Sequence, residues 1–324
     1  AVIRLATVLE RSGALGKAIN SYEKALQINP NNLKALLSLI RIHTERHNTQ
    51  KAFELAKTAH KIAPDDSDVT HALGRLAFQS GDFPWSRSLL QEVALKHPDD
   101  PDVLFDLAQA FYSVGRVSDA ETAMRHASQS GAGFSHSDDA KLFLEFITLP
   151  SDPAQVAAAA NRADQVLKTD AANVPALMVL AAIYDQKHDG SAALETYNKV
   201  LGRYPDFTPA KKRLAILYAA NASDNQRAFD LAVKAREDFP DDSELAKAFG
   251  VILYRQKDFA RATKVLEESA AQRADDAEVM YYLGMARYGL KQRAGSKQAL
   301  QRALDMKLGP DLAPDAKKTL ADLK

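Results

Sequence analysis

A segment with a helical pattern that ends in proline returns every 34 residues, and this period constrains the fold more than any other feature. KAINSYEKALQINP ends at Pro30, KAFELAKTAHKIAP ends at Pro64 and WSRSLLQEVALKHP ends at Pro98. The same phase returns in segments that end at Pro205 and Pro240. A fixed period of this length is typical of a stacked array in which each unit packs only against its neighbours. The sequence therefore predicts a solenoid rather than a domain with one central core.

Each period contains two helical patterns joined by a short turn. In LKALLSLIRIHTERHN, apolar residues recur at helical spacing, and in the segment that follows Ala52, Ala56 and Ala59 share one face. Small residues on that face let two helices approach closely. Glycines in the first helical patterns are expected to remove a side chain where a neighbouring helix presses in: Gly74, Gly250 and Gly284.

The turns carry equally regular signals. Between units, PDDSD (64–68), PDDPD (98–102) and PDDSE (240–244) combine a proline, which cannot continue a helix, with an Asp or Ser that caps the next one. Within units, glycine recurs in SGAL (12–15), SGDF (80–83) and VGRV (114–117). We expect these glycines to adopt a positive φ, as at many helix ends.

These residues resemble the tetratricopeptide repeat, a family whose 34-residue units fold as helix–turn–helix. The family signature is Leu-Gly and aromatic residues in the first helix, alanines in the second and a closing proline. Here the matching residues are Leu283-Gly284, Phe111, Tyr184 and Tyr218, with Ala18, Ala52, Ala120, Ala193 and Ala262. The resemblance implies an all-α fold: a right-handed α-solenoid of stacked helix–turn–helix repeats with a C-terminal capping helix.

The spacing of the repeats predicts two blocks and a cap. Residues 1–132 hold a truncated first repeat and three further repeats, and residues 133–310 hold a degenerate unit and four repeats. A longer step between the blocks falls in the small, polar stretch 128–138, where we expect a bend or a change in pitch. Residues 311–324 predict a capping helix. Because the first repeat lacks its opening turn, we expect the chain to be a fragment of a longer protein.

Composition excludes several classes of function. Lys and Arg number 42 and Asp and Glu also number 42, so no basic region favours a nucleic acid or an anionic membrane surface. The absence of cysteine excludes disulfides, thiol catalysis and Cys-ligated zinc. Apolar stretches fall short of the roughly 18 residues of a spanning helix, so direct membrane insertion is not expected. No pattern typical of a hydrolase, a phosphate loop or a dinucleotide site occurs, so we predict a non-enzymatic protein without a cofactor.

In tetratricopeptide arrays the first helices line a concave groove, and residues between their packing positions face it. Such residues follow an i, i+4, i+7 spacing here and mix aromatic and polar side chains, as recognition surfaces do. The alternative is that some of the rings pack against the next repeat. The predicted groove residues are His71, Arg75 and Phe78; Phe105, Gln109 and Tyr112; Lys247, Val251 and Tyr254; and Tyr281, Met285 and Tyr288.

One known variant of the family clamps a C-terminal carboxylate with Lys, Asn and Arg. The corresponding positions here hold Lys34, Leu37 and Arg41, followed by Asp68 and His71. The asparagines are missing, so we do not expect binding of chaperone tails.

Two histidines lie one helical turn apart in HTERH, with Glu45 between His43 and His47. This is not the HExxH pattern of zinc proteases. His43 falls at a packing position and His47 at a turn, so we predict a structural pair with satisfied hydrogen bonds and no metal. The PDD clusters lack the glycine and distal glutamate of a calcium loop, and capping already explains them.

The leading hypothesis is a scaffold that binds a protein or peptide in the groove. The alanine-rich repeats, the absence of cysteine and the final LGPDLAP turn resemble bacterial envelope arrays, in particular repeat lipoproteins of the PEP-CTERM/exosortase system and of exopolysaccharide secretion. That resemblance implies a periplasmic or outer-membrane-anchored protein, with the cytoplasm left open. Two alternatives are a polysaccharide-binding array whose groove aromatics stack on sugars, and a regulatory segment of a larger enzyme.

Overall fold

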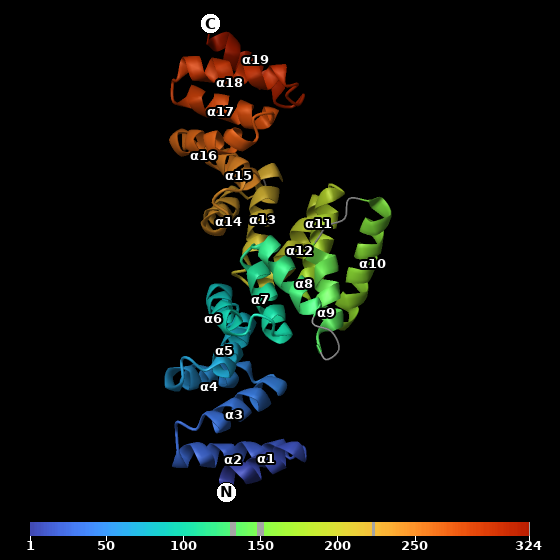
Figure 1. Cartoon of the computed structure of the whole chain (residues 1–324). Helices are drawn as coiled ribbons and strands as arrows, with labels where there is room; N and C mark the ends of the chain where they lie inside the picture. Colours follow the sequence, from blue (N-terminus) through green and yellow to red (C-terminus); the bar gives the residue numbers. More distant parts are fainter. Residues whose placement is uncertain (130–133, 148–151, 222–223, 324) are drawn as a thin grey trace. The chain divides into compact units, whose positions relative to one another are not determined.

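The computed structural model describes residues 1–129, 134–147, 152–221 and 224–323. Over these residues the chain forms nineteen α-helices and no β-strand, which confirms the predicted all-α class. Helices α1 to α18 alternate as the first and second helices of the predicted repeats, and α19 takes the place of the predicted cap (Figure 1).

The chain divides into two compact units. Unit 1 comprises Ala1–Ser151 with Tyr204–Asp206, and unit 2 comprises Asp152–Arg203 with Phe207–Lys324. The predicted blocks 1–132 and 133–310 remain a prediction, and so does the bend between them. Residues 130–133 of the long polar stretch lie outside the described residues.

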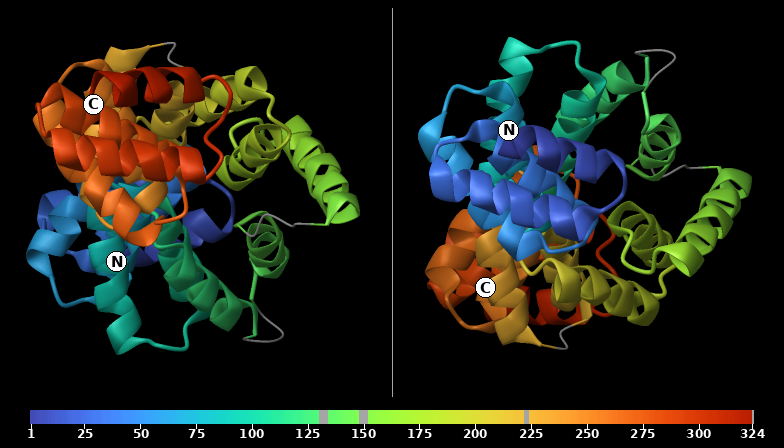
Figure 2. Two further views of the ribbon diagram at one scale, coloured as in Figure 1. Left: turned by 90° about the horizontal axis from the view of Figure 1, so that it is seen from above. Right: turned by 90° about the horizontal axis from the view of Figure 1, so that it is seen from below.

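Unit 1 is a stack of helix pairs in which each second helix packs against the first helix of the next pair. The right view of Figure 2 shows α1 and α2, in dark blue, lying side by side. The helices of unit 1 are α1 (Val2–Arg11), α2 (Leu15–Ile28), α3 (Leu33–Glu45), α4 (Thr49–Ile62), α5 (Ser67–Gln79), α6 (Phe83–Lys96), α7 (Pro101–Ser113), α8 (Val117–Ser128) and α9 (Ser137–Ile147).

Unit 2 repeats the same plan and ends in a single helix that packs on α18 and α17. Its helices are α10 (Pro153–Thr169), α11 (Val174–Gln186), α12 (Gly190–Arg203), α13 (Thr208–Asn221), α14 (Asn225–Asp238), α15 (Ser243–Arg255), α16 (Phe259–Gln272), α17 (Ala277–Gly289), α18 (Arg293–Asp305) and α19 (Ala313–Asp322).

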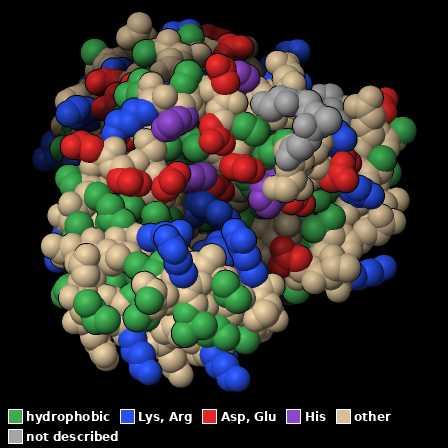
Figure 3. Space-filling model, turned by 60° about the horizontal axis from the view of Figure 1, so that its bottom comes forward, with side chains coloured by type: hydrophobic (Ala, Val, Ile, Leu, Met, Phe, Trp, Pro, Cys, Tyr) green, Lys and Arg blue, Asp and Glu red, His purple; other side chains and the backbone are tan. Residues whose placement is uncertain are grey.

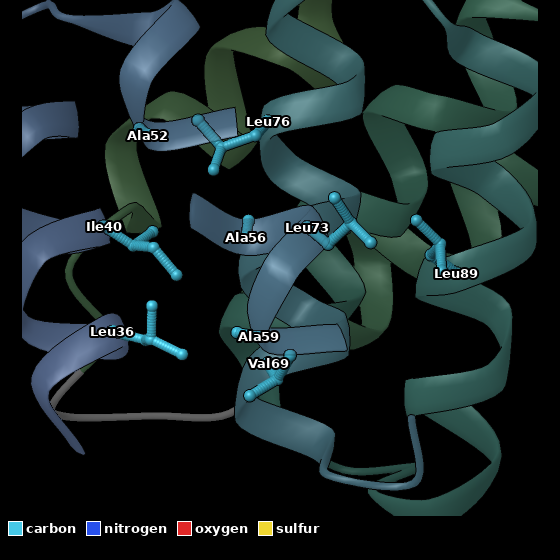
Figure 4. Packing of buried hydrophobic residues seen from close by; sticks show 9 residues of the cluster. All are labelled: Leu36, Ile40, Ala52, Ala56, Ala59, Val69, Leu73, Leu76 and Leu89. Atoms are coloured by element: carbon cyan, nitrogen blue, oxygen red, sulfur yellow. The ribbon is translucent and has the colours of Figure 1, made fainter. Parts of the chain in front are cut away.

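The core between α3, α4, α5 and α6 shows how the repeats stack. Ala52, Ala56 and Ala59 of α4 are fully buried, which confirms the predicted small-residue face. Figure 4 shows larger side chains around them, such as Leu36 of α3 and Leu73 of α5. A first helix therefore packs its leucines against the alanines of the preceding second helix.

Gly74, Gly250 and Gly284 lie where the two helices of a pair approach closely. A Cβ atom at Gly74 would lie 2.9 Å from Leu90 Cγ, and one at Gly250 would lie 2.5 Å from Leu266 Cγ. No side chain fits at such distances without movement of the neighbouring leucine. The predicted role of these glycines in helix packing is confirmed.

Aspartates cap the first helices, as predicted from the PDD turns. The side chain of Asp66 accepts a hydrogen bond from the Val69 N–H at 3.0 Å, and Asp242 accepts one from the Leu245 N–H at 2.8 Å. Asp100 caps α7 in the same way. In each of these turns the second aspartate is the cap, and it satisfies N–H groups that the helix leaves without a partner.

The turns within units share one backbone conformation. Gly13, Gly81 and Gly115 have φ values of 77°, 84° and 79°, which confirms the prediction for these glycines. Four other units place a larger residue in the same turn at φ values from 57° to 63°: His47, His188, Lys257 and Lys291. The positive φ is thus imposed by the helix pair and is retained where glycine is absent.

Candidate functional site

The predicted groove residues all lie on first helices, and each set of three shares one helix. The sets lie on α5 and α7 in unit 1, and on α15 and α17 in unit 2. The two units differ in how these residues are placed. All of the predicted residues in unit 1 except Tyr112 border open hollows, whereas most of those in unit 2 are engaged in contacts between repeats.

Two adjoining hollows follow the first helices of unit 1. One, of about 630 Å³, lies between α3 and α5 and includes Arg41, Asp68 and His71 in its lining. The other, of about 270 Å³, includes Phe78, Phe105, Asp106, Gln109 and His136. Arg75 and Gln79 line both hollows, so the two form one continuous surface. We call this surface the unit-1 groove.

Asp106 organises the polar side of the unit-1 groove. His71 Nε2 lies 2.7 Å from Asp106 Oδ2, and Arg75 Nε lies 3.3 Å from the same oxygen. Half of the Arg75 side chain remains exposed, so its guanidinium is fixed through Nε and still reaches the groove. Asp106 was not among the residues predicted from the sequence. The sequence feature that could have indicated it is its position 35 residues after His71, which places it about one repeat further along the chain.

The aromatic residues of the unit-1 groove are held by ring contacts. Phe105 stacks on His136, with ring centroids 4.8 Å apart and an angle of 10° between the planes. Phe78 makes an edge contact with Phe83 at 5.2 Å. Tyr112, in contrast, is buried to 8% exposure against Phe143 of α9. The packing alternative therefore describes Tyr112, whereas Phe78 and Phe105 keep part of their surface.

In unit 2, the charged groove residue is engaged by the following repeat. Lys247 Nζ lies 3.1 Å from Asp276 Oδ2 and 2.7 Å from Glu278 Oε2. Burial alone would raise the pKa of Asp276, but the charge of Lys247 and the hydrogen bond from the Val279 N–H outweigh it and hold that pKa below its ordinary value. Lys247 therefore joins α15 to the start of α17.

Helix α19 covers two of the predicted groove residues of α17. The Tyr281 hydroxyl donates a hydrogen bond to Asp315 Oδ2 at 2.7 Å, and the Thr319 hydroxyl lies 3.5 Å from Met285 Sδ. Tyr281 and Met285 are 4% and 9% exposed, so both belong to the packed seat of the cap. Burial and the bond to Asp315 raise the pKa of the Tyr281 phenol.

The remaining predicted groove residues of unit 2 differ in their exposure to solvent. Val251 is buried, Tyr254 is partly buried with its ring 5.5 Å from that of Tyr282, and Tyr288 is exposed. Burial raises the pKa of Tyr254, with a further contribution from the charge of Asp315. That these side chains contact a partner remains a prediction.

A second charge network in unit 2 was not predicted from the sequence. Arg213 of α13 forms ion pairs with Asp185 of α11 and with Glu244 of α15, the latter at 3.0 Å. Tyr197 lies beside this network and is 1% exposed, and burial raises the pKa of its phenol to about 12. Arg213 thus joins three successive first helices.

The histidine pair in unit 1 differs from the prediction in one respect. His43 is buried to 9% exposure and His47 lies in the turn with φ 57°, as expected. The prediction of satisfied hydrogen bonds was wrong, because neither ring nitrogen of His43 has a partner among the described residues. Packing holds the His43 ring in place, but no described neighbour accepts from it or donates to it.

The surface and the side-chain clusters limit the chemistry of the described residues. Figure 3 shows basic and acidic side chains interspersed over one face, without a continuous field of one sign. In the described ranges no group of three or more His, Asp or Glu side chains could hold a metal ion. None of the helices in these ranges is both long enough and apolar enough to cross a bilayer.

Paired helices stacked in series, with a groove along the first helices, define a helical-repeat array. Models of the tetratricopeptide repeat family match residues 9–76, 43–103 and 77–137 in unit 1, and residues 278–305 in unit 2. These matched segments carry the tetratricopeptide repeat, in agreement with the resemblance found in the sequence.

Curated relatives are much longer than this chain. Protein CTR9 homolog from Arabidopsis thaliana is 23% identical over 86% of the chain, and the alignment covers 26% of that protein. Cellulose synthase 1 operon protein C from Komagataeibacter xylinus is 27% identical over 39% of the chain and 10% of its own length. A crystal structure of YrrB, described as a TPR protein with an unusual peptide-binding site, aligns with 71% of this chain and 97% of its own, at 16% identity and a TM-score of 0.40.

Proposed function

We propose that this chain is a non-catalytic scaffold that holds an extended segment of a partner protein in the unit-1 groove. The observation that carries the proposal is the continuity of the two hollows around Arg75. A segment lying along α3, α5 and α7 would meet charged side chains in the first hollow and the rings of Phe78 and Phe105 in the second. Arginine and aromatic side chains are the residues that most often anchor partners at interfaces.

Unit 2 is a weaker candidate for binding a partner, because most of its predicted groove residues are already engaged. Its predicted groove cation, Lys247, is bound by carboxylates of the next repeat, and α19 covers Tyr281 and Met285. A partner would have to break these contacts before it could use the side chains. In unit 1, Arg75 keeps half of its surface while Asp106 holds it in place.

A capture experiment tests this proposal. The wild-type chain would be compared with an Arg75→Ala, Phe105→Ala variant, and bound proteins would be identified by mass spectrometry. The control is Tyr288→Ala, because Tyr288 is an exposed residue of the predicted set on a first helix of unit 2. Circular dichroism would verify that the variants fold.

We expect a protein that is captured by the wild type and by Tyr288→Ala, and lost with the double variant. Equal capture by all three chains would contradict the assignment to unit 1. Retention of polysaccharide by the wild type, with no protein lost from the double variant, would instead support the carbohydrate-binding alternative.

We further propose a role in the bacterial envelope, in exopolysaccharide export or protein sorting. Two observations support it: the resemblance of the alanine-rich repeats to envelope arrays, and the similarity of part of the chain to cellulose synthase 1 operon protein C. Cell fractionation of the full-length natural protein tests this role. Recovery in the periplasmic or outer-membrane fraction is expected, and recovery only with cytoplasmic markers would contradict it.

A further inference from the structure

Both arginines in the lining of the first hollow of the unit-1 groove already have carboxylate partners. Arg41 of α3 forms ion pairs with Glu10 and with Glu45, the latter at 2.7 Å. Arg75 of α5 lies 3.3 Å from Asp106 through its Nε atom. Since each arginine faces at least one carboxylate, these cations and their partners together leave no net positive charge in the hollow.

Asp68, which lines the same hollow, has no cation. It is exposed in the first turn of α5 and forms no ion pair or side-chain hydrogen bond with any residue that the structure describes. The N–H groups at the start of a helix stabilise an acid in the first turn, which explains why the fold tolerates Asp68. They offset only about half of an elementary charge. The first hollow therefore keeps an excess of negative charge at Asp68.

Two nearby groups of opposite or variable charge leave this excess in place. Lys34 occupies the corresponding place on α3, one period earlier, but it does not line the hollow and lies beyond ion-pair distance of Asp68. His71 contacts Asp106, at 2.7 Å, rather than Asp68. A cation held directly at Asp68 would gain more from that carboxylate than it loses to the more distant, exposed Lys34.

The second hollow offers apolar surface rather than an unpaired charge. Phe78, Leu90 and Phe105 line it, and the rings of both phenylalanines are only partly buried. Arg75 and Asp106 also belong to its lining, and they contact each other. An aromatic or large aliphatic side chain of a partner would therefore find ring surface in this hollow.

The positions of Asp68 and Phe78 set the spacing between the two contacts. They lie ten residues apart on α5, which corresponds to roughly 15 Å along a helix. An extended chain advances about 3.3 Å per residue, and every second side chain faces the same side. Two partner residues four positions apart thus face the groove together, roughly 13 Å from each other. The length of a lysine or arginine side chain covers the remainder.

We propose that the unit-1 groove selects a partner segment that carries a basic residue and, four positions away, an aromatic or large aliphatic residue. The Lys or Arg of the partner pairs with Asp68, and the apolar side chain packs against Phe78 and Phe105. Between these contacts, Arg75 donates to a backbone carbonyl of the segment. This inference rests on the function proposed for the unit-1 groove and adds the chemistry of the partner.

Fluorescence anisotropy with labelled, end-capped peptides tests the inference on the full chain. One probe carries a lysine and a phenylalanine four positions apart in an otherwise uncharged sequence, and the second carries a glutamate in place of the lysine. Each is made in both orders, because the direction of the segment in the groove is free. We expect the lysine peptide, in one of its orders, to bind about fivefold more tightly than the glutamate peptide, and to bind less tightly as salt is added.

Asp68→Asn removes the charge and retains the size of the side chain. Its matched control is Asp102→Asn, because Asp102 is exposed at the same place in the first turn of α7 and lines neither hollow. Asp68→Asn should weaken binding of the lysine peptide about two- to fivefold, as expected for an exposed ion pair. Asp102→Asn should leave the binding unchanged.

Asp68→Lys reverses the charge in the first hollow. The fold should tolerate it, because α3 carries Lys34 at the corresponding place. We expect the preference to invert, so that the glutamate peptide binds this variant more tightly than the lysine peptide does. Loss of folding would weaken both peptides alike and would not invert their order, and circular dichroism verifies the fold of each variant.

Three results would overturn the inference: equal binding of the lysine and glutamate peptides, equal effects of Asp68→Asn and Asp102→Asn, or binding of neither peptide. The capture experiment shows whether the proposed function fails as well. A protein that the wild type captures and the Arg75→Ala, Phe105→Ala variant loses would support the groove, even where the preference for a basic segment is rejected.

Discussion

The Cγ atom of Leu300 lies 2.7 Å from the place that a Cβ atom would take at Gly284, and the Leu300 backbone nitrogen lies 3.1 Å from it. Helices α17 and α18 therefore meet at a point where even a methyl group does not fit. The leucine side chain could rotate away, but the backbone contact would remain. This relationship fixes how closely the last helix pair can pack.

Gly284→Val should destabilise the last repeat, because the added side chain forces α17 and α18 apart. We expect a loss of about 1–3 kcal/mol in the free energy of unfolding, typical of an overfilled core. Chemical denaturation followed by circular dichroism measures it. Gly16→Ala in α2 is the control, because a Cβ at Gly16 has no neighbour within 4 Å and alanine favours the helix. Equal stability of Gly284→Val and the wild type would contradict the packing.

Stability should fall in strongly alkaline solution because of buried tyrosines in unit 2. The Tyr197 phenol has an ordinary pKa of 10.0 when unfolded, and burial raises it to about 12 in the folded protein. The folded state thus holds a proton that the unfolded state loses, so this stability is complete below pH 10 and is lost as the pH rises to 12. The expected loss is about 2–3 kcal/mol.

Urea denaturation between pH 9 and pH 12 checks this expectation. Tyr197→Phe keeps the ring and cannot ionise, so its stability should fall less steeply than that of the wild type. Tyr281 and Tyr254 also have raised pKa values and will retain part of the slope. If the two chains lose stability in parallel, the burial of the Tyr197 hydroxyl does not control the alkaline limit.

Replacing Arg213 by alanine should destabilise unit 2 by about 2–4 kcal/mol, since it leaves Asp185 and Glu244 without their cation. Differential scanning calorimetry measures the change. Lys141→Ala is the matched control: its ion pair with Asp138 is exposed on both sides, and we expect less than about 0.5 kcal/mol from it. Similar effects of the two substitutions would show that the Arg213 network contributes no more than a surface pair.

Deleting residues 311–324 should expose the apolar side of α17. Tyr281 and Met285 would lose the cover of α19, and Ala316, now fully buried, would be removed with it. We expect increased binding of a hydrophobic dye and association detected by light scattering. Lys318→Ala, on the exposed side of α19, should behave like the wild type. A truncated chain that stays monomeric and binds no additional dye would show that α19 is not required as a cover.

The sequence was sufficient to predict the helix pairs, the caps and the turn glycines, because each depends on residues within a single period. Asp66 and Gly81 act on their own turn, and the 34-residue repetition makes such signals visible. The partners of groove residues were not visible in this way. Whether Arg75 reaches Asp106, or Tyr281 reaches Asp315, depends on side-chain conformations and on the exact offset between two helices.

The candidate site was therefore predicted only in outline. The predicted residues lie on first helices, but pattern alone could not distinguish Phe105, which borders a hollow, from Tyr112, which α9 covers. Both occupy positions that the spacing treats alike. The same limit applied to His43, whose burial was predicted while its lack of hydrogen-bond partners was not.

The ion pairs between repeats in unit 2 recur at equivalent places. Lys212 binds Asp242, the cap of α15, and Lys247 binds Asp276, the cap of α17. The repeat that begins with α15 thus provides a cation for the next repeat and an acceptor for the previous one. Duplication of a whole repeat copies both halves of this link together, whereas a break inside a repeat separates them. An array built in this way can change its length during evolution by gaining or losing complete units without leaving a charge unpaired at the junction.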